Sequence, residues 1–353
     1  VILNVVLICG AVWLAPKLDE PGMALAYAVF LAGILQLLFQ LPFLAKLGTL
    51  PRPRWAPGHA GVKRAVKLML PAIFGSSVAQ INVLLSGIIA SMLGVGSISY
   101  LYFSDRLMEF PLGLFGIALA TVTLPYLSRL WSRGMQQEFA QTLDWSMKIA
   151  LLIAAPAALG LLLLAEPLVA TLFYGGIFDE RAVVMTALAL KAYALGLIGF
   201  SFVKILAPAF FAREDTRTPV RIGILALIVN AVLSVSLAWY LTVSGFDGAH
   251  AGLAAATSVS ALLNAALLYF GLRRDRVIKH APGWLALGMQ VLLANAVMWI
   301  ILDRFYRPLE WWLEADFNGR VLWLGLSVCM AAAAYFICLF LLGLRPAKLK
   351  LKH

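Results

Sequence analysis

The chain has 353 residues, of which 62% are hydrophobic and only 13% are charged, and its formal net charge is +11. Soluble globular domains carry about 25% charged residues, so the composition excludes a water-soluble fold and leaves lipid as the main solvent. Apolar runs of about 20 residues, long enough to cross a bilayer as a helix, recur from end to end. This pattern predicts an all-α fold, a polytopic helical membrane protein.

Ten transmembrane helices are predicted, each an apolar run bounded by turn signals such as LDEPG, PRPRWAPG and SGFDG. The chain begins at Val1 with neither a methionine nor a basic segment before the first apolar run. We therefore expect that run to be the remainder of a helix in a longer, N-terminally truncated protein. The predicted spans are 1–15, 22–45, 66–92, 97–128, 143–166, 185–207, 219–243, 249–271, 284–303 and 320–343.

Basic residues gather in every second connection between these spans, while the alternate connections are acidic or neutral. This is the positive-inside pattern, which predicts cytoplasmic basic loops and a cytoplasmic C-terminus. Loops that face anionic lipid thus account for the net charge. A nucleic-acid partner is not predicted, because no aromatic-basic ribbon or basic domain accompanies the charge. The basic segments are 46–67, 129–148, 208–221, 272–283 and 344–353.

The domain organisation follows from the breaks in the apolar pattern. The Pro- and Gly-rich connection 46–65 is predicted to be a cytoplasmic linker between two lobes. Residues 1–45 would be the last two helices of an N-terminal lobe, and residues 66–271 a six-helix C-terminal lobe. Two extra helices are predicted over 284–343, followed by a cytoplasmic tail at 344–353.

Three charges interrupt the span 97–128, in the stretch SYLYFSDRLMEFPLG. Arg106 lies about 13 Å from the predicted outer end, at a depth where an unpaired charge costs about 2.5–3.5 kcal/mol on insertion scales. Arg106 and Glu109 can pair at i,i+3, and Asp105 and Glu109 lie at i,i+4. Pro111 bends the helix and frees carbonyls that need polar surroundings.

Two interpretations fit this cluster. It could be an ion-pair lock between helices, or Arg106 could line a water-filled cavity and bind a phosphate or carboxylate through its bidentate fork. We favour the cavity, because a lock needs only one pair near an interface. Glu109 would then position Arg106 or take part in ion coupling, and Asp105 would face either the cavity or a neighbouring helix.

Other polar residues within the spans are weaker signals. Lys204 lies near a predicted cytoplasmic end, where it can reach the headgroups or line the cavity. Asn230 and Asn264 are uncharged, so interhelical hydrogen bonding is favoured over a place in the cavity. The isolated cysteines and histidines predict neither a disulfide nor a metal site. Close helix packing is expected at four glycines, namely Gly113, Gly116, Gly196 and Gly199.

Three stretches resemble a known family over the whole chain: YFSDRLMEFPLGLFGIALATVTLPYLS, KILAPAFFAREDTRTPVRIGI and KLMLPAIFGSSVAQINVLLSGIIAS. They closely resemble the lipid II flippase family MurJ, also called MviN, of the exporter superfamily that includes multidrug and polysaccharide-lipid transporters. The resemblance implies a fourteen-helix fold of two six-helix lobes plus two extra helices. The ten spans predicted here would be the last ten of that fold.

The resemblance also implies a function and roles for particular residues. The protein would be a transporter that moves lipid II, an undecaprenyl-diphosphate-linked peptidoglycan precursor, across the bacterial inner membrane by alternating access. A cavity role transfers to Arg106 and Glu109, and a place at the outer gate to Ser99, with Pro111 assigned to the same gate. The extra helices at 284–343 would form a groove for the polyprenyl tail.

Lipid II and membrane lipids are the implied partners, and no cofactor or metal is implied. Movement would draw on the membrane potential or an ion gradient. The chain lacks the G-x-x-x-x-G-K-[ST] pattern, so an ATP-driven pump within it is unsupported.

Alternatives remain at this stage. A related exporter of drugs or of other polyprenyl-linked sugars would share the pattern, because substrate class depends on cavity residues, most of which this chain lacks. A membrane-embedded transferase acting on polyprenyl phosphates is disfavoured, since the acids of the outer loops do not converge. A truncated chain could also be a scaffold that does not transport. The outer-loop acids are Asp179, Glu180, Glu310, Glu314 and Asp316.

Overall fold

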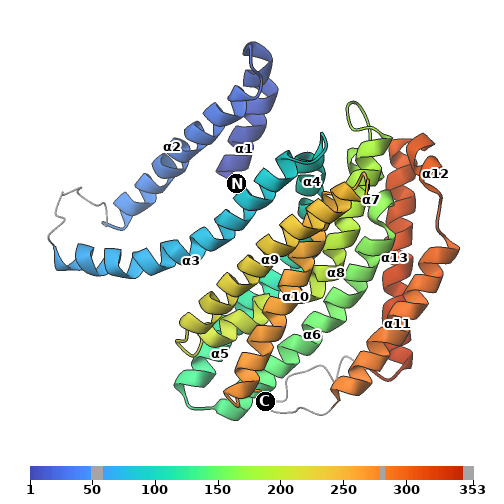
Figure 1. Ribbon diagram of the computed structural model, residues 1–353. Coiled ribbons are helices and arrows are strands. Elements are labelled where there is room, and N and C mark those ends of the chain that lie inside the picture. Colours follow the sequence, from blue (N-terminus) through green and yellow to red (C-terminus); the bar gives the residue numbers. More distant parts are fainter. Residues whose placement is uncertain (49–58, 279–282, 345–353) are drawn as a thin grey trace. The chain divides into compact units, whose positions relative to one another are not determined.

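The computed structural model describes residues 1–48, 59–278 and 283–344, and for residues 60, 64, 65, 67–79 and 115–122 it describes the backbone alone (Figure 1). Part of the predicted linker (49–58) and most of the predicted tail (345–353) lie outside this description. The described chain is helical and contains no named β-strand. Its elements are α1 (Ile2–Cys9), η1 (Gly10–Leu14), η2 (Ala15–Lys17), α2 (Met23–Lys46), α3 (Ala60–Ser91), α4 (Ser97–Pro111), η3 (Leu112–Ile117), α5 (Ala118–Ser132), α6 (Gln136–Leu163), α7 (Ala165–Phe173), α8 (Glu180–Phe211), α9 (Arg217–Val243), α10 (Ala251–Arg274), α11 (Trp284–Arg304), α12 (Leu309–Glu314) and α13 (Phe317–Leu341).

The chain divides into two compact units, Val1–Leu70 and Pro71–His353. In the first unit α1 packs against α2 through small residues. Ala24, Ala28 and Ala32 recur every four residues along α2 and are buried. A Cβ atom added to Gly10 would lie only 2.8 Å from the Cβ of Ala28. Small side chains therefore bring these two helices together, as is common for helices packed in lipid.

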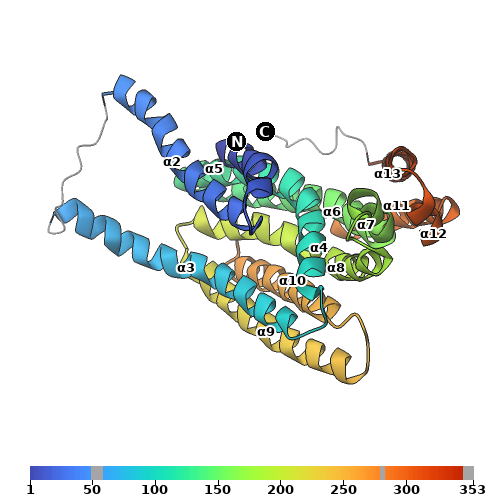
Figure 2. The same ribbon diagram turned by 90° about the horizontal axis from the view of Figure 1, so that it is seen from above.

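The second unit is organised around α8, which packs against α4, α6 and α10. Figures 1 and 2 show α9 and α10 on one side of α8 and the α11–α13 pair on the other. Buried leucines and alanines of α4, α7, α8 and α10 form one apolar core, and α5, α6, α8 and α10 form a second. A third core joins α6 to α11 and α13, so the last two long helices pack against the rest of this unit through α6.

The predicted close packing at glycine is confirmed at two positions. A Cβ on Gly196 would lie 2.6 Å from Ser258 Cα, and one on Gly199 would lie 2.7 Å from the backbone nitrogen of Leu262. At Gly113, an added Cβ would meet nothing within 4 Å among the described residues, so the structure does not show a close approach there. Gly116 belongs to the residues described by their backbone alone.

In the part of the chain that the structure describes, seven helices are long and apolar enough to cross a membrane, and each overlaps one of the ten predicted spans. Among the described residues, the segments 2–17 and 80–91 are shorter apolar helices, and the charged span 97–128 is divided. The structure is thus that of a multi-pass helical membrane protein. The seven helices are α2, α6, α8, α9, α10, α11 and α13.

The predicted span 97–128 is not one continuous α-helix. Helix α4 ends at Pro111, and a π-helical segment follows it before α5 begins. Proline has no backbone N–H, so the helical hydrogen-bond ladder loses one bond at this point. Single π-helical turns occur where that ladder is disturbed, often at functional sites.

Several helices extend beyond the apolar runs that predicted them. Helix α6 begins at Gln136 rather than at 143, and α3 begins at Ala60, inside the predicted linker. Two short helices were not predicted: α7 begins within the last two residues of the predicted span 143–166 and continues past it, and α12 lies between the last two spans. A helix satisfies its backbone hydrogen bonds internally, so it can continue past the lipid, whereas apolar composition marks only the part in contact with lipid.

Candidate functional site

Helix α4 presents one polar face and one packed face. Leu101, Ser104 and Met108 are buried against the rest of the second unit. Ser99, Tyr102, Arg106 and Glu109 are exposed, and their spacing of three or four residues places them along a single stripe. The helix period alone therefore brings the predicted gate serine and the predicted cavity residues onto the same side of α4.

Arg106 is held by contacts along its own helix. Its Nη1 atom donates to Oε2 of Glu109 at 2.6 Å, and its Nη2 atom lies 4.0 Å from Oδ2 of Asp105. The guanidinium also lies over the ring of Tyr102, 5.3 Å from the ring centroid. The side chains of Arg106 and Glu109 are 55% and 50% exposed. Within the described part of the chain, no ion pair ties Arg106 to another helix, as a lock between helices would require.

The other predicted site residues are distributed differently. Lys204 is exposed on α8 and Asn264 is half-buried on α10, and in the described structure neither joins the ion pairs around Arg106. Asn230 is buried on α9, and its Nδ2 atom donates to Oδ1 of Asn82 on α3. This bond confirms the interhelical role that the sequence favoured for Asn230.

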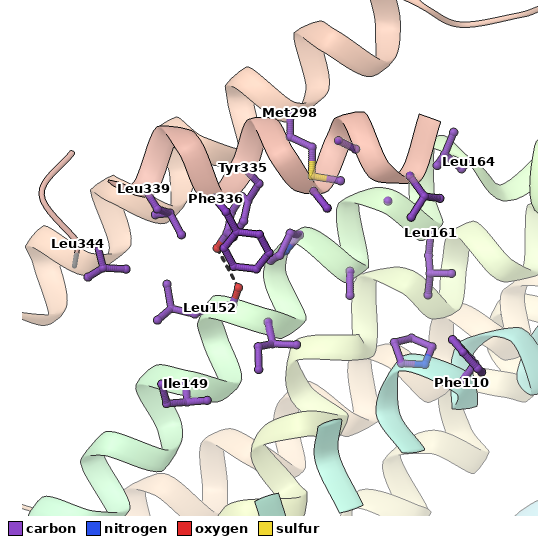
Figure 3. A pocket seen from close by; sticks show the side chains of 18 of the residues that line it. Phe110, Ile149, Leu152, Leu161, Leu164, Met298, Tyr335, Phe336, Leu339 and Leu344 are labelled. Atoms are coloured by element: carbon purple, nitrogen blue, oxygen red, sulfur yellow. Dashed lines mark hydrogen bonds between the residues drawn. The ribbon is translucent and has the colours of Figure 1, made fainter. Parts of the chain in front are cut away.

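Pro111 faces an apolar cavity of about 890 Å³ rather than the polar stripe. Phe110 and Pro111 of α4 contribute to its wall, together with residues of α6, α11 and α13 (Figure 3). Among the described lining residues, the hydroxyl of Tyr335 is the one polar side-chain group. Ile149, Met298 and Leu339 mark the contributions of α6, α11 and α13.

The polar stripe and the wall of the apolar cavity occupy successive turns of α4. Arg106 and Phe110 are four residues apart, which is about 6 Å along a helix axis and close to one full turn. This helix therefore carries a half-exposed guanidinium and, one turn later, a side chain that walls a space whose described lining residues carry no charge. This arrangement suits an amphiphile with an anionic head and an apolar tail, because each part meets the surroundings that it prefers.

Sequence reasoning missed a polar cluster between α7, α8 and the connection after α11. Lys191 Nζ donates to Oε1 of Glu166 at 2.6 Å, and the hydroxyl of Tyr306 donates to Oε2 of the same carboxylate at 3.2 Å. Burial, together with the Glu166 carboxylate, raises the pKa of Tyr306 above its ordinary value. The signal available in the sequence was a lysine, Lys191, and a glutamate, Glu166, in neighbouring predicted spans.

A second missed cluster lies at the other end of α11. Trp284 Nε1 donates to Oδ1 of Asp144 at 2.6 Å, and Lys148 Nζ pairs with Oδ2 of Asp144 at 2.7 Å. The two clusters attach both ends of α11 to the helices before it. Across the residues that the structure describes, no group of three or more His, Cys, Asp or Glu side chains could hold a metal ion.

The fold and this site define a multi-pass helical membrane protein with an exposed arginine next to an apolar cavity. The sequence model of the family described as Lipid II flippase MurJ matches residues 1–311. The chain belongs to that family.

Individual relatives agree with this assignment. The chain is 44% identical to a probable lipid II flippase MurJ of Vibrio cholerae, a match that covers 99% of this chain and 65% of that protein. It is 40% identical to the lipid II flippase MurJ of Burkholderia cenocepacia, with 98% of this chain and 67% of that protein covered. The chain thus spans about two thirds of the length of these curated relatives.

A solved structure shares the fold. The chain superposes on a lipid II flippase MurJ in an inward closed conformation with a TM-score of 0.69, at 22% identity. The match covers 96% of this chain and 67% of that one. The resemblance of the sequence to this family is confirmed.

Proposed function

We propose that the protein to which this chain belongs moves lipid II, the polyprenyl-diphosphate-linked peptidoglycan precursor, across the bacterial inner membrane. Family membership and the names of the relatives support this substrate. The observation that carries the proposal is the placement of half-exposed Arg106 one turn from an apolar cavity on the same helix. A diphosphate lipid needs both features, because its head cannot enter hydrocarbon unaided and its tail avoids water.

Arg106 binds the diphosphate in this mechanism. Glu109 occupies Nη1 of the guanidinium, which leaves the Nε and Nη2 donors to face phosphate oxygens in bidentate geometry. Glu109 also compensates the charge of Arg106 while the site is empty, so the arginine can remain in an apolar helix. The polyprenyl tail lies in the apolar cavity between α6 and the α11–α13 pair.

The proposal includes the full topology. All ten helical regions cross the membrane, the basic connections and the C-terminus face the cytoplasm, and residues 66–271 form a six-helix lobe with α11 and α13 added to it. The lobes alternate access to the two sides of the membrane, driven by the membrane potential or an ion gradient. Ser99 lies at the outer gate with Pro111, and Asp105, Lys204 and Asn264 contribute to the polar surroundings of the diphosphate head rather than to the apolar cavity.

Complementation of a strain depleted of its own flippase tests this function, with variants made in the complete gene. Arg106→Ala should abolish growth while the protein still inserts in the membrane, because the diphosphate loses its cation. Arg106→Lys keeps the charge but loses the fork, and it should support growth only partly. Arg181→Ala, which breaks an exposed ion pair with Asp247, is the matched control and should grow normally. Normal growth with Arg106→Ala would reject the proposed role of Arg106.

A further inference from the structure

Helix α6 carries a proline within its length, and the proline leaves one carbonyl without its usual partner. Residue 156 would normally donate its backbone N–H to the carbonyl of residue 152. Pro156 has no N–H, so the carbonyl of Leu152 loses its donor inside α6. Both residues line the apolar cavity, where water cannot cheaply replace the missing donor.

Tyr335 of α13 supplies that donor. Its hydroxyl donates to the carbonyl oxygen of Leu152 at 2.9 Å, across 183 residues of chain, and Figure 3 shows this bond at the wall of the cavity. The side chain of Tyr335 is fully buried at 0% exposure. A buried tyrosine requires a partner for its hydroxyl, and a carbonyl next to a helical proline requires a donor. The two requirements are met by one bond.

This bond lies in the middle part of α13. The other polar contacts of α13 with neighbouring segments described here lie near its two ends. Near its start, Arg320 donates to the carbonyls of Ala170 and Tyr174. Just past its end, the carbonyl of Leu342 accepts from Gln290 of α11. In the described part of the chain, the bond of Tyr335 is the hydrogen bond that joins α13 to α6, and α6 forms the opposite wall of the cavity.

We propose that Tyr335 is a positioning residue for the apolar cavity, because its hydroxyl replaces the backbone donor that Pro156 lacks and fixes α13 on α6. The inference rests on the proposed function in one respect, namely that a polyisoprenoid chain occupies the cavity. With the bond intact, α13 keeps a fixed rotation about its own axis and a fixed axial position relative to α6. The apolar lining residues then face the tail. Without it, the carbonyl of Leu152 must find another donor, and α13 loses its fixed register with α6.

A double-mutant cycle isolates this role. Tyr335→Phe removes the hydroxyl alone, while Pro156→Ala restores an N–H that can bond the carbonyl of Leu152 within α6. The probe is a polyprenyl phosphate with a photoreactive terminal isoprene, added to membrane vesicles that contain the complete protein. The readout is the labelling of α6 and α13 per inserted protein molecule.

The expected loss of labelling depends on whether the carbonyl of Leu152 has another donor. Tyr335→Phe should lower labelling about 3- to 10-fold, the range that an interhelical hydrogen bond in a bilayer supports. In the Pro156→Ala background, Tyr335→Phe should change labelling by less than about twofold, because the carbonyl then has a donor without Tyr335. Tyr240→Phe, on an exposed position of α9, is the matched control and should label like the wild type.

The contrary outcomes separate the two proposals. A wild-type chain that is not labelled in α6 or α13 would overturn the place of the tail in the proposed function, and the present inference with it. Wild-type labelling that is unchanged by Tyr335→Phe would overturn only the positioning role. An equal loss in both backgrounds would also overturn it, since Tyr335 would then act through something other than the carbonyl freed by Pro156.

Discussion

The indole N–H of Trp284, the first residue of α11, donates to the carboxylate of Asp144 on α6 at 2.6 Å. Lys148 pairs with the same carboxylate and lies beneath the indole ring, with Nζ 5.8 Å from the ring centroid. The start of the last helical pair is thus attached to α6 by one shared carboxylate. Several consequences of such contacts can be measured.

Trp284→Phe should loosen the start of α11. The variant loses one hydrogen bond to a charged acceptor, which should lower the free energy of unfolding by about 1 kcal/mol. Asp144 keeps its partner Lys148, so no unpaired charge is left behind. Thermal unfolding in detergent measures the change, and Trp239→Phe, on a residue that is 74% exposed, serves as the control. Equal stability of Trp284→Phe and the wild type would contradict the anchoring role.

The pair Lys191–Glu166 should behave as a partly buried ion pair. Its side chains are 38% and 22% exposed, so the ion pair is neither fully exposed nor fully buried. Lys191→Met leaves Glu166 charged with only the Tyr306 hydroxyl, and it should destabilise the protein by about 1–2 kcal/mol.

The double variant Lys191→Met with Glu166→Leu should recover most of that loss, because it removes both charges together. Unfolding midpoints of the single and double variants, compared in one detergent, measure the coupling. A double variant that is less stable than Lys191→Met would contradict this expectation. The ion pair would then stabilise the fold by more than the cancellation of its two charges.

Gly196→Ala should push α10 away from α8. The added methyl group would lie 2.6 Å from Ser258 Cα, a backbone atom that cannot move without the helix, so a loss of about 1–3 kcal/mol is expected. Gly223→Ala on α9 would meet nothing within 4 Å of its Cβ among the described residues and should be neutral or slightly stabilising, because alanine favours the helix. Unfolding curves that place the two variants in the opposite order would argue against the packing of α8 on α10.

Asp215 should make the start of α9 sensitive to acid. Partial burial acts to raise its pKa, but hydrogen bonds from Thr218 and Arg217, with the charge of Arg213, outweigh it and hold the pKa below the usual 3.8. A carboxyl whose pKa is lowered on folding stabilises the folded state above its unfolded pKa and loses that contribution as the pH falls through the folded value.

Unfolding followed from pH 7 down to about pH 3 tests this sign. Asp215→Asn should be less stable than the wild type at neutral pH, and the difference should shrink below about pH 4. A difference that stays constant over the whole range would show that the charge of Asp215 is not what stabilises this turn.

The sequence by itself determined the class of the protein, since a chain with 13% charged residues has no polar coat for water and must place its helices in lipid. It also predicted that Arg106 and Glu109 pair on one face, because i,i+3 spacing is a property of the helix alone. The family followed from local motifs, which keep their order whatever the packing.

Only the tertiary structure decided which distant residues meet. The bond of Tyr335 to Leu152, the pair Lys191–Glu166 and the bond of Trp284 to Asp144 join residues that are 183, 25 and 140 positions apart. Hydrophobic periodicity shows that a helix has an apolar face but not which partner covers it, since many apolar faces fit one another nearly equally well. Polar contacts between helices, and the apolar cavity beside Pro111, form only when the helices pack in a definite order and at definite axial positions.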